Sequence, residues 1–190
     1  IGGTPYAGST RLLPIASGYA SNIFNGSIVS IVAAGTVEMV TVTGNGGGGA
    51  AASFPAGTIG VFVGCTYSDP VTGNLTFNQY WPSGTVAADA QAYIVDDPDV
   101  VFMAQANGAV TQADLGQNTN FAAVQSTTTG DTTNGNSNSA VSSTTATTAT
   151  IAFRIVDFVD SPTSTVGDAF TDLLLKFNAG IHSYTNSTGI

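Results

Sequence analysis

Short runs of β-branched and aromatic residues, separated by turns that contain glycine or proline, dominate this chain of 190 residues. Residues of the first kind favour strands, while glycine and proline favour turns. Seven runs fit this description: Ser27–Val32, Thr36–Thr43, Thr58–Tyr67, Thr76–Tyr80, Gln91–Val95, Val100–Gln105 and Ile151–Val159. The pattern predicts an all-β protein, either a sandwich or a barrel of short antiparallel strands, with an extended N-terminal arm and long Gly- and Thr-rich loops.

Helix signals are confined to two places. Thr111–Asp114 has the character of a capping box, but the short apolar stretch that follows stops at Gly116, so we expect a single turn at most. Gly167–Asn178 is ambiguous, because its first half fits the start of an amphipathic helix and Leu173–Phe177 fits a final strand. We favour the strand, because the rest of the chain is β.

The length fits one domain, preceded by an arm. Residues 1–22 are short apolar pieces broken by Gly and Pro, which predicts an extended arm rather than regular structure. Within it, Leu12, Leu13 and Ile15 are candidates to pack on the body or on a neighbouring molecule. Residues 23–190 are predicted to form a single β-rich domain.

Two segments of this domain have a biased composition. Residues 126–150 are mostly Ser and Thr, and we expect Thr127–Asn138 to be a loop and Ala140–Thr150 to be strand-like. Gly44–Ala52 consists largely of glycine and alanine and predicts a flexible loop. It matches the spacing of a dinucleotide-binding loop, but neither a clear helix nor a suitably placed acidic residue follows.

The charge composition excludes whole classes of partner. Only three residues are Lys or Arg, against 12 Asp and Glu, so the formal net charge is −9. Nucleic-acid binding and adhesion to anionic membranes both need clustered cations, and neither is expected. No uninterrupted apolar run approaches the roughly 20 residues of a membrane-spanning helix, so no membrane partner is predicted.

Few residues could carry catalysis. Cys65 is the single cysteine and lies in an apolar run, which predicts a buried, inert thiol and excludes an intrachain disulfide. His182 is the single histidine, and no Gly-x-Ser-x-Gly elbow accompanies it, so a packing or hydrogen-bonding role is expected. No acid–base pair stands out. We therefore predict that the chain is not an enzyme and has no catalytic residues and no cofactor.

Asp96, Asp97 and Asp99 form the densest acidic cluster, with Pro98 inside it. Several carboxylates close together can hold Ca²⁺, but the spacing does not match an EF-hand. Acidic residues beside a proline are also typical of turns, in which an Asp side chain caps the backbone. The turn is the favoured interpretation, and the three residues are weak metal candidates.

Tyr67, Phe77, Tyr80 and Trp81 form an aromatic cluster around a turn. We expect a satellite core beneath a long loop. The second interpretation is a protein interface, with Tyr80 and Trp81 as its candidate anchors. The third is a small-molecule site.

Several phrases of the sequence resemble head proteins of tailed bacteriophages that are encoded near the major capsid gene. They are Leu13-Pro-Ile-Ala-Ser-Gly-Tyr-Ala-Ser21, Asn25-Gly-Ser27, Val63-Gly-Cys-Thr-Tyr67, Phe77-Asn-Gln-Tyr-Trp81, Tyr93-Ile-Val-Asp-Asp-Pro-Asp-Val-Val-Phe102, Gln105-Ala-Asn-Gly108, Leu175-Lys-Phe-Asn178, His182-Ser-Tyr-Thr185 and Thr188-Gly-Ile190. The resemblance implies a capsid decoration (cement) protein or a related virion component. It implies a β-rich fold on the outer capsid surface, often as a homotrimer, with the major capsid protein as partner.

The chemistry of the chain agrees with this implication. A low charge fraction allows many copies to crowd on a lattice, and the residual negative charge keeps free copies soluble. We hypothesise that Ile1–Ser21 is the arm that docks on the capsid. Two alternatives remain open. One is a secreted or surface-array protein whose arm builds extracellular filaments. The other is a carbohydrate-binding β-module that uses the Tyr67–Trp81 aromatics as a sugar platform.

Overall fold

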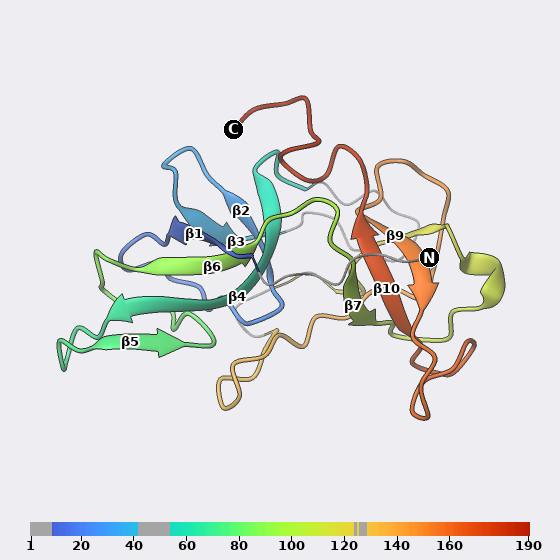
Figure 1. Ribbon diagram of the computed structural model, residues 1–190, viewed down its shortest axis with the longest axis horizontal. Helices are drawn as coiled ribbons and strands as arrows, with labels where there is room; N and C mark the ends of the chain where they lie inside the picture. The colour runs from blue at the N-terminus through green and yellow to red at the C-terminus, as the bar shows by residue number, and fades with distance from the viewer. Residues whose placement is uncertain (1–8, 42–53, 124, 126–128) are drawn as a thin grey trace.

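The computed structural model describes residues 9–41, 54–123, 125 and 129–190, which form two antiparallel sheets and one short 3₁₀ helix (Figure 1). The prediction of an all-β fold of short antiparallel strands is confirmed. Each of the seven runs expected to contain a strand does contain one. Two strands were not expected, β1 (Arg11–Pro14) and β8 (Asn118–Thr119), and each lies at an end of its sheet.

The first sheet has six strands and rolls into a barrel. Its order is β1-β6-β4-β2-β3, and β5 also pairs with β4. The further strands are β2 (Ile28–Ile31), β3 (Val37–Met39), β4 (Thr58–Ser68), β5 (Leu75–Asn78) and β6 (Gln91–Val95). A parallel bridge between Ile15 and Val37 joins the segment after β1 to β3, so the two ends of the strand order meet. β5 stands outside this closed path.

The barrel has its own apolar core, because alternate residues of each strand point inward. Leu13, Phe62 and Ile94 contribute from β1, β4 and β6, and Trp81 is fully buried among them. Gly60 permits the close approach of β4 and β6. Its φ is +151°, and a Cβ there would lie 2.0 Å from the carbonyl oxygen of Val95. A side chain at this position would therefore force the two strands apart.

The second sheet has the order β7-β10-β9-β8. Its strands are β7 (Phe102–Gln105), β8, β9 (Phe153–Phe158) and β10 (Asp172–Phe177). The strand interpretation of Leu173–Phe177 is thus confirmed. The single turn expected at Thr111–Asp114 is the 3₁₀ helix η1 (Gln112–Asp114), with Thr111 and Asp114 forming the capping box.

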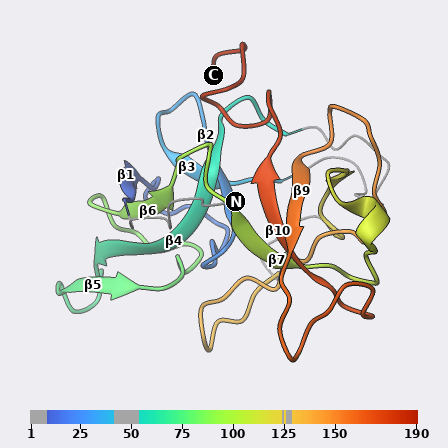
Figure 2. The same ribbon diagram turned by 45° about the vertical axis from the view of Figure 1, so that its right-hand side comes forward.

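The two sheets lie side by side (Figures 1 and 2) and pack through a second core, in which aliphatic side chains surround a group of phenylalanine rings. A continuous series of ring contacts, with centroids 5.3 to 6.0 Å apart, connects Phe54, Phe121, Phe153, Phe177 and Phe102. Ile28 and Val61 reach this core from the outside of the barrel. The barrel is therefore attached to the second sheet by one part of its outer surface.

The Ser/Thr-rich segment differs from the expectation in its second half. Within residues 129–150, Ala140–Thr150 forms isolated bridges rather than a continuous strand, for example between Val141 and Ala106 and between Ala146 and Asn118. Hydroxyl groups explain this outcome, because side-chain hydrogen bonds compete with ladder pairing. The Thr145 hydroxyl, for instance, donates to Asp114 Oδ1 at 2.6 Å. The described residues 129–138 of the first half are mainly turn and loop, as expected, with isolated bridges between Gly130 and Ser137 and between Asn25 and Asn136.

Residues 9–22 were expected to belong to an extended arm outside the β-rich domain, but they include a strand of the barrel. Arg11–Pro14 pairs with β6 along its whole length, with Leu12 opposite Tyr93 and Leu13 opposite Ala92. Pairing and burial therefore make this part of the arm an integral strand of the barrel. Residues 1–8 and the Gly44–Ala52 loop lie outside the described residues.

Candidate functional site

Charged and polar residues that are far apart in the sequence meet where the turn after β6 contacts the C-terminal segment. The Tyr184 hydroxyl donates to Asp96 Oδ2 at 2.7 Å and accepts a hydrogen bond from Arg11. Arg11 Nη1 also lies 3.6 Å from Asp96 Oδ2. These three side chains connect β1, the end of β6 and the C-terminal segment. Their polar groups are therefore engaged in contacts within the fold.

The remaining acidic residues of this turn have separate partners. Asp97 Oδ1 accepts a hydrogen bond from the backbone N–H of Asp99 at 2.8 Å, which is the turn geometry favoured from the sequence. Asp99 Oδ1 lies 2.5 Å from Lys176 Nζ, and this ammonium group lowers the pKa of Asp99. Among the described residues, no three His, Cys, Asp or Glu side chains converge on a common point that could hold a metal ion. The weak metal candidates Asp96, Asp97 and Asp99 therefore act in structural contacts.

His182 is buried beneath the same C-terminal segment. Its ring centroid is 5.7 Å from that of Phe177 and 5.0 Å from that of Tyr184, and its Nδ1 accepts the backbone N–H of Tyr184 at 3.2 Å. Burial lowers the pKa of His182, while the Ile59 carbonyl and the charge of Asp96 act in the opposite direction. A neutral, packed imidazole that accepts a backbone hydrogen bond has the role expected from the sequence.

Cys65 belongs to the barrel core and has no exposed surface. Its sulfur faces the carbonyl oxygens of Asn78 and Tyr80, and burial raises the pKa of the thiol to about 12. A thiol of this kind stays protonated and unreactive at neutral pH. The prediction of a buried cysteine is confirmed.

The aromatic cluster around the β4–β5 hairpin divides between core and surface. Trp81 is fully buried, its ring centroid lies 5.4 Å from that of Tyr67, and its Nε1 donates to the Tyr19 carbonyl at 3.3 Å. Tyr80 is half-buried and stacks on Phe24 at 5.6 Å. The favoured satellite-core interpretation therefore describes Trp81 and Tyr67. Neither ring is accessible as a sugar platform in the folded chain.

Of the three interface candidates in the N-terminal region, two are buried and one is exposed, because successive residues of a strand point to opposite faces. Leu13 and Ile15 are buried in the barrel, with 8% and 3% of their surface exposed. Leu12 points outward and is 52% exposed. Of these three, Leu12 alone is available to a partner while the chain is folded.

Leu12 belongs to an apolar surface formed by residues of β1, β6 and β5, which we call the outer barrel face: Leu12, Tyr93, Phe77 and Leu75. Leu12 lies opposite Tyr93, and the Phe77 ring centroid is 5.8 Å from that of Tyr93. Phe77 lies over Gly64, where a Cβ would be only 3.0 Å from the ring. Phe77 is 65% exposed and Leu75 is 75% exposed. None of the four is charged. The alternation of Leu75 and Phe77 with Thr76 and Asn78 separates the two faces of β5, but by itself it would place the apolar face on the core, so the exposure of Leu75 and Phe77 follows from the fold.

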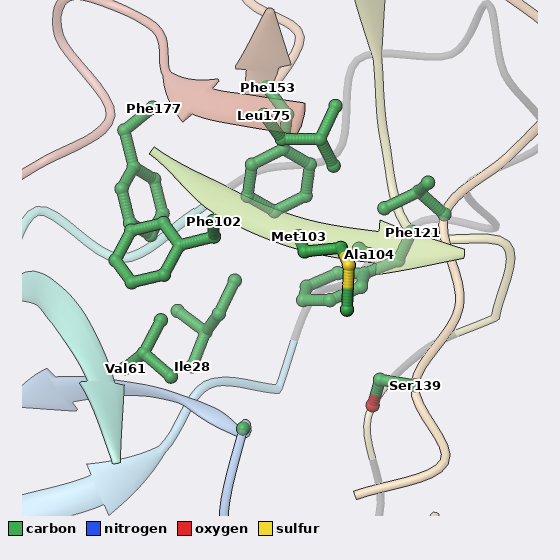
Figure 3. A pocket seen from close by; sticks show the side chains of 12 residues that line it. Ile28, Val61, Phe102, Met103, Ala104, Phe121, Ser139, Phe153, Leu175 and Phe177 are labelled. Carbon is green, nitrogen blue, oxygen red and sulfur yellow. The ribbon is translucent and has the colours of Figure 1, made fainter. Parts of the chain in front are cut away.

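An apolar cavity of about 120 Å³ lies between the two sheets (Figure 3). Its lining includes Ile28 and Val61 from the barrel and Phe102, Phe153 and Phe177 from the second sheet, with Ser139 at one side. The lining contains no charged side chain. The cavity can therefore contribute apolar contacts but no acid–base chemistry.

No helix in the described part of the chain is long and apolar enough to cross a membrane. In that part, Cys65 and His182 are packed in the interior and Asp96, Asp97 and Asp99 take part in hydrogen bonds and ion pairs, while the outer barrel face exposes uncharged apolar side chains to solvent. Comparison with known proteins finds no matching family model, no matching curated protein and no matching solved structure.

Proposed function

We propose that this chain is a non-enzymatic structural protein of a tailed-phage virion, which binds the outer surface of the capsid lattice and stabilises it. Its partner is the major capsid protein. By contacting adjacent capsid subunits, the bound protein holds them together against internal pressure. The resemblance of its sequence to phage head proteins supports this proposal, and so does the chemistry of the exposed surface.

The observation that carries the proposal is the outer barrel face. Leu12, Phe77 and Leu75 are apolar, yet each of these side chains is more than half exposed to solvent. Contiguous exposed apolar side chains mark protein interaction surfaces. Interface cores are also poor in charge and rich in aromatic residues, which fits Phe77 and Tyr93. A face of this composition suits a broad protein partner better than a small substrate.

The docking hypothesis changes in one respect. Deleting Ile1–Leu13 would remove most of β1 and the buried Leu13 side chain, so the deletion would disturb the barrel as well as any docking contact. We therefore assign docking to the outer barrel face, of which Leu12 is the N-terminal member. Substitutions that leave the barrel core unchanged test this assignment more cleanly than a truncation.

The test is binding of purified protein to virus particles that lack it. The double variant Leu12→Ser/Tyr93→Ser removes apolar contact from the face but keeps both strands. We expect its binding to be at least about tenfold weaker, the loss typical of truncating one interface hot spot. Val86→Ser is the matched control, because Val86 is 67% exposed on a loop outside this face. Equal binding by wild type and the double variant would contradict the assignment.

A further inference from the structure

β5 is a sheet edge without a neighbour among the described residues, whereas the other sheet ends have one. The ends at β1 and β3 meet through the Ile15–Val37 bridge. At β7, the N–H of Val141 donates to the Gln105 carbonyl at 3.0 Å. At β8, Asn118 and Ala146 exchange two hydrogen bonds of 2.9 Å. Figures 1 and 2 show no other segment along the outer side of β5.

The hydrogen-bonding groups that β5 leaves open follow from its pairing with β4. The N–H of Asp69 donates to the carbonyl of Asn74 at 2.9 Å, and hydrogen-bonded and non-hydrogen-bonded pairs alternate along an antiparallel ladder. Thr76 and Asn78 therefore bond to β4. Leu75 and Phe77 point their N–H and C=O groups away from β4, toward solvent.

Natural sheets protect such edges with charged residues, proline, bulges or a covering segment. β5 reads Leu-Thr-Phe-Asn and contains no charge and no proline, and its pairing with β4 shows no register shift. Its two outward side chains are 75% and 65% exposed. An edge that is both unprotected and apolar is a template for another strand.

We propose that β5 pairs with β5 of a second copy of this chain, antiparallel and around a two-fold axis. A symmetric pair must place residues of the same face opposite each other, because side chains alternate. With Thr76 on the axis, Leu75 of each copy lies opposite Phe77 of the other. The open N–H and C=O groups of these residues then form four hydrogen bonds, and the apolar side chains pair across the strands.

The charge distribution favours a second copy in this orientation. Each chain carries a net charge of −9, so the repulsion between two copies is smallest where the contact surface itself is uncharged, as at β5. Asp69 and Asp89 both lie at the turn end of the β4–β5 pair, where Asp89 accepts hydrogen bonds from Ser68. Antiparallel pairing puts these carboxylates at opposite ends of the contact, whereas parallel pairing would bring them together.

This inference does not depend on the proposed function. The two-fold axis is perpendicular to the paired strands' sheet, so the outer barrel faces of both copies point to the same side and form one larger surface. The symmetry differs from the three-fold association implied by the resemblance to phage head proteins. The stoichiometry of the free protein therefore separates the two arrangements.

The experiment combines cross-linking with a mass measurement on the full chain. Thr76→Cys places two thiols across the axis, and oxidation should give a disulfide-linked dimer in high yield. Val71→Cys is the control, because Val71 is 91% exposed at the turn tip and far from the axis; it should cross-link much less. The native Cys65 is buried and its thiol has a pKa of about 12, so it does not compete.

Light scattering of the wild type should give twice the 19.0 kDa chain mass. Leu75→Lys, which adds the kind of charge that guards natural edges, should give the monomer mass with an unchanged circular dichroism spectrum. A wild-type trimer or monomer, or equal cross-linking of Thr76→Cys and Val71→Cys, would overturn the inference. Particle binding is tested separately by the Leu12→Ser/Tyr93→Ser variant, which leaves β5 unchanged.

Discussion

The side-chain amide of Gln125 pairs with the backbone of Ile28 as a neighbouring strand would. Its Oε1 accepts the N–H of Ile28 at 2.9 Å, and its Nε2 donates to the Ile28 carbonyl at 3.2 Å and to the Val40 carbonyl at 3.2 Å. Gln125 is 1% exposed. One side chain thus satisfies three backbone groups where the barrel meets the second core.

Replacing this amide should destabilise the fold. In Gln125→Leu the Ile28 N–H and the Val40 carbonyl lose their buried partner, and each unsatisfied group costs about 1–3 kcal/mol, whereas the Ile28 carbonyl still accepts the Val40 N–H at 3.0 Å. We expect a loss of about 3 kcal/mol in the free energy of unfolding, measured by urea denaturation. Gln112→Leu, at an exposed position of η1, should change it by less than about 0.5 kcal/mol. Equal effects of the two substitutions would contradict the role given to Gln125.

Leu12 and Leu13 are adjacent, yet they should respond oppositely to truncation. Leu13→Ala leaves a cavity in the barrel core and should reduce stability by about 2–5 kcal/mol. Leu12→Ala should change stability by less than about 0.5 kcal/mol but weaken particle binding. Thermal denaturation and particle binding of both variants check this. If Leu13→Ala folded normally and only lost binding, residues 11–14 would be a docking arm after all.

Gly60 should not tolerate a side chain. Gly60→Ala places a Cβ against the Val95 carbonyl and requires an unfavourable φ, so we expect a loss of at least about 3 kcal/mol. Gly189→Ala is the control, because open space surrounds that position. Urea denaturation of both variants measures the difference. Similar stability of the two would mean that β4 and β6 do not approach as described.

The buried histidine should make stability depend on pH below neutrality. Burial lowers the pKa of His182 in the folded state, so the unfolded state binds a proton first as the pH falls. Stability is therefore complete above the ordinary histidine pKa of about 6.5 and declines as the pH falls below it. The lowered pKa values of Asp99 and Asp114 affect stability only at much lower pH, near the ordinary aspartate value of 3.8 and below.

The measurement is the free energy of unfolding between about pH 7 and pH 5, the range in which histidine titrates. His182→Asn keeps a hydrogen-bond acceptor for the Tyr184 N–H but has no titrating group. The wild type should lose stability over this range, and the variant should show a flatter profile. Because His182 is the single histidine of the chain, identical slopes would remove it as the cause.

The sequence predicted those strands in which apolar alternation and β-propensity are both evident within the strand itself. β6 coincides with the predicted Gln91–Val95, because alternation and β-propensity agree there. β1 escaped prediction because Arg11–Pro14 contains one inward residue, Leu13, and its extended state depends on pairing with β6. Ala140–Thr150 does not form a continuous strand, and this too depends on partners distant in the sequence, such as Asp114 for Thr145. Tertiary contacts therefore determine the secondary structure of these two segments.

The candidate surface was only partly visible in the sequence. Leu12 and the hairpin aromatics were identified, but sequence alone could not tell the exposed Phe77 from the buried Trp81. That distinction depends on which face of the barrel each residue occupies. Likewise, Asp96 and His182 were noted separately, and their position under one C-terminal segment follows from the fold.

The central claim is tested most directly by the copy number of this chain relative to the major capsid protein in purified virus particles, measured by quantitative mass spectrometry. A lattice-wide decoration protein should be present at a one-to-one ratio or a simple fraction of it. A dozen copies or fewer per particle would instead place the protein at the neck, tail or fibre. Its absence from particles, with recovery in a secreted or filament fraction, would contradict the account.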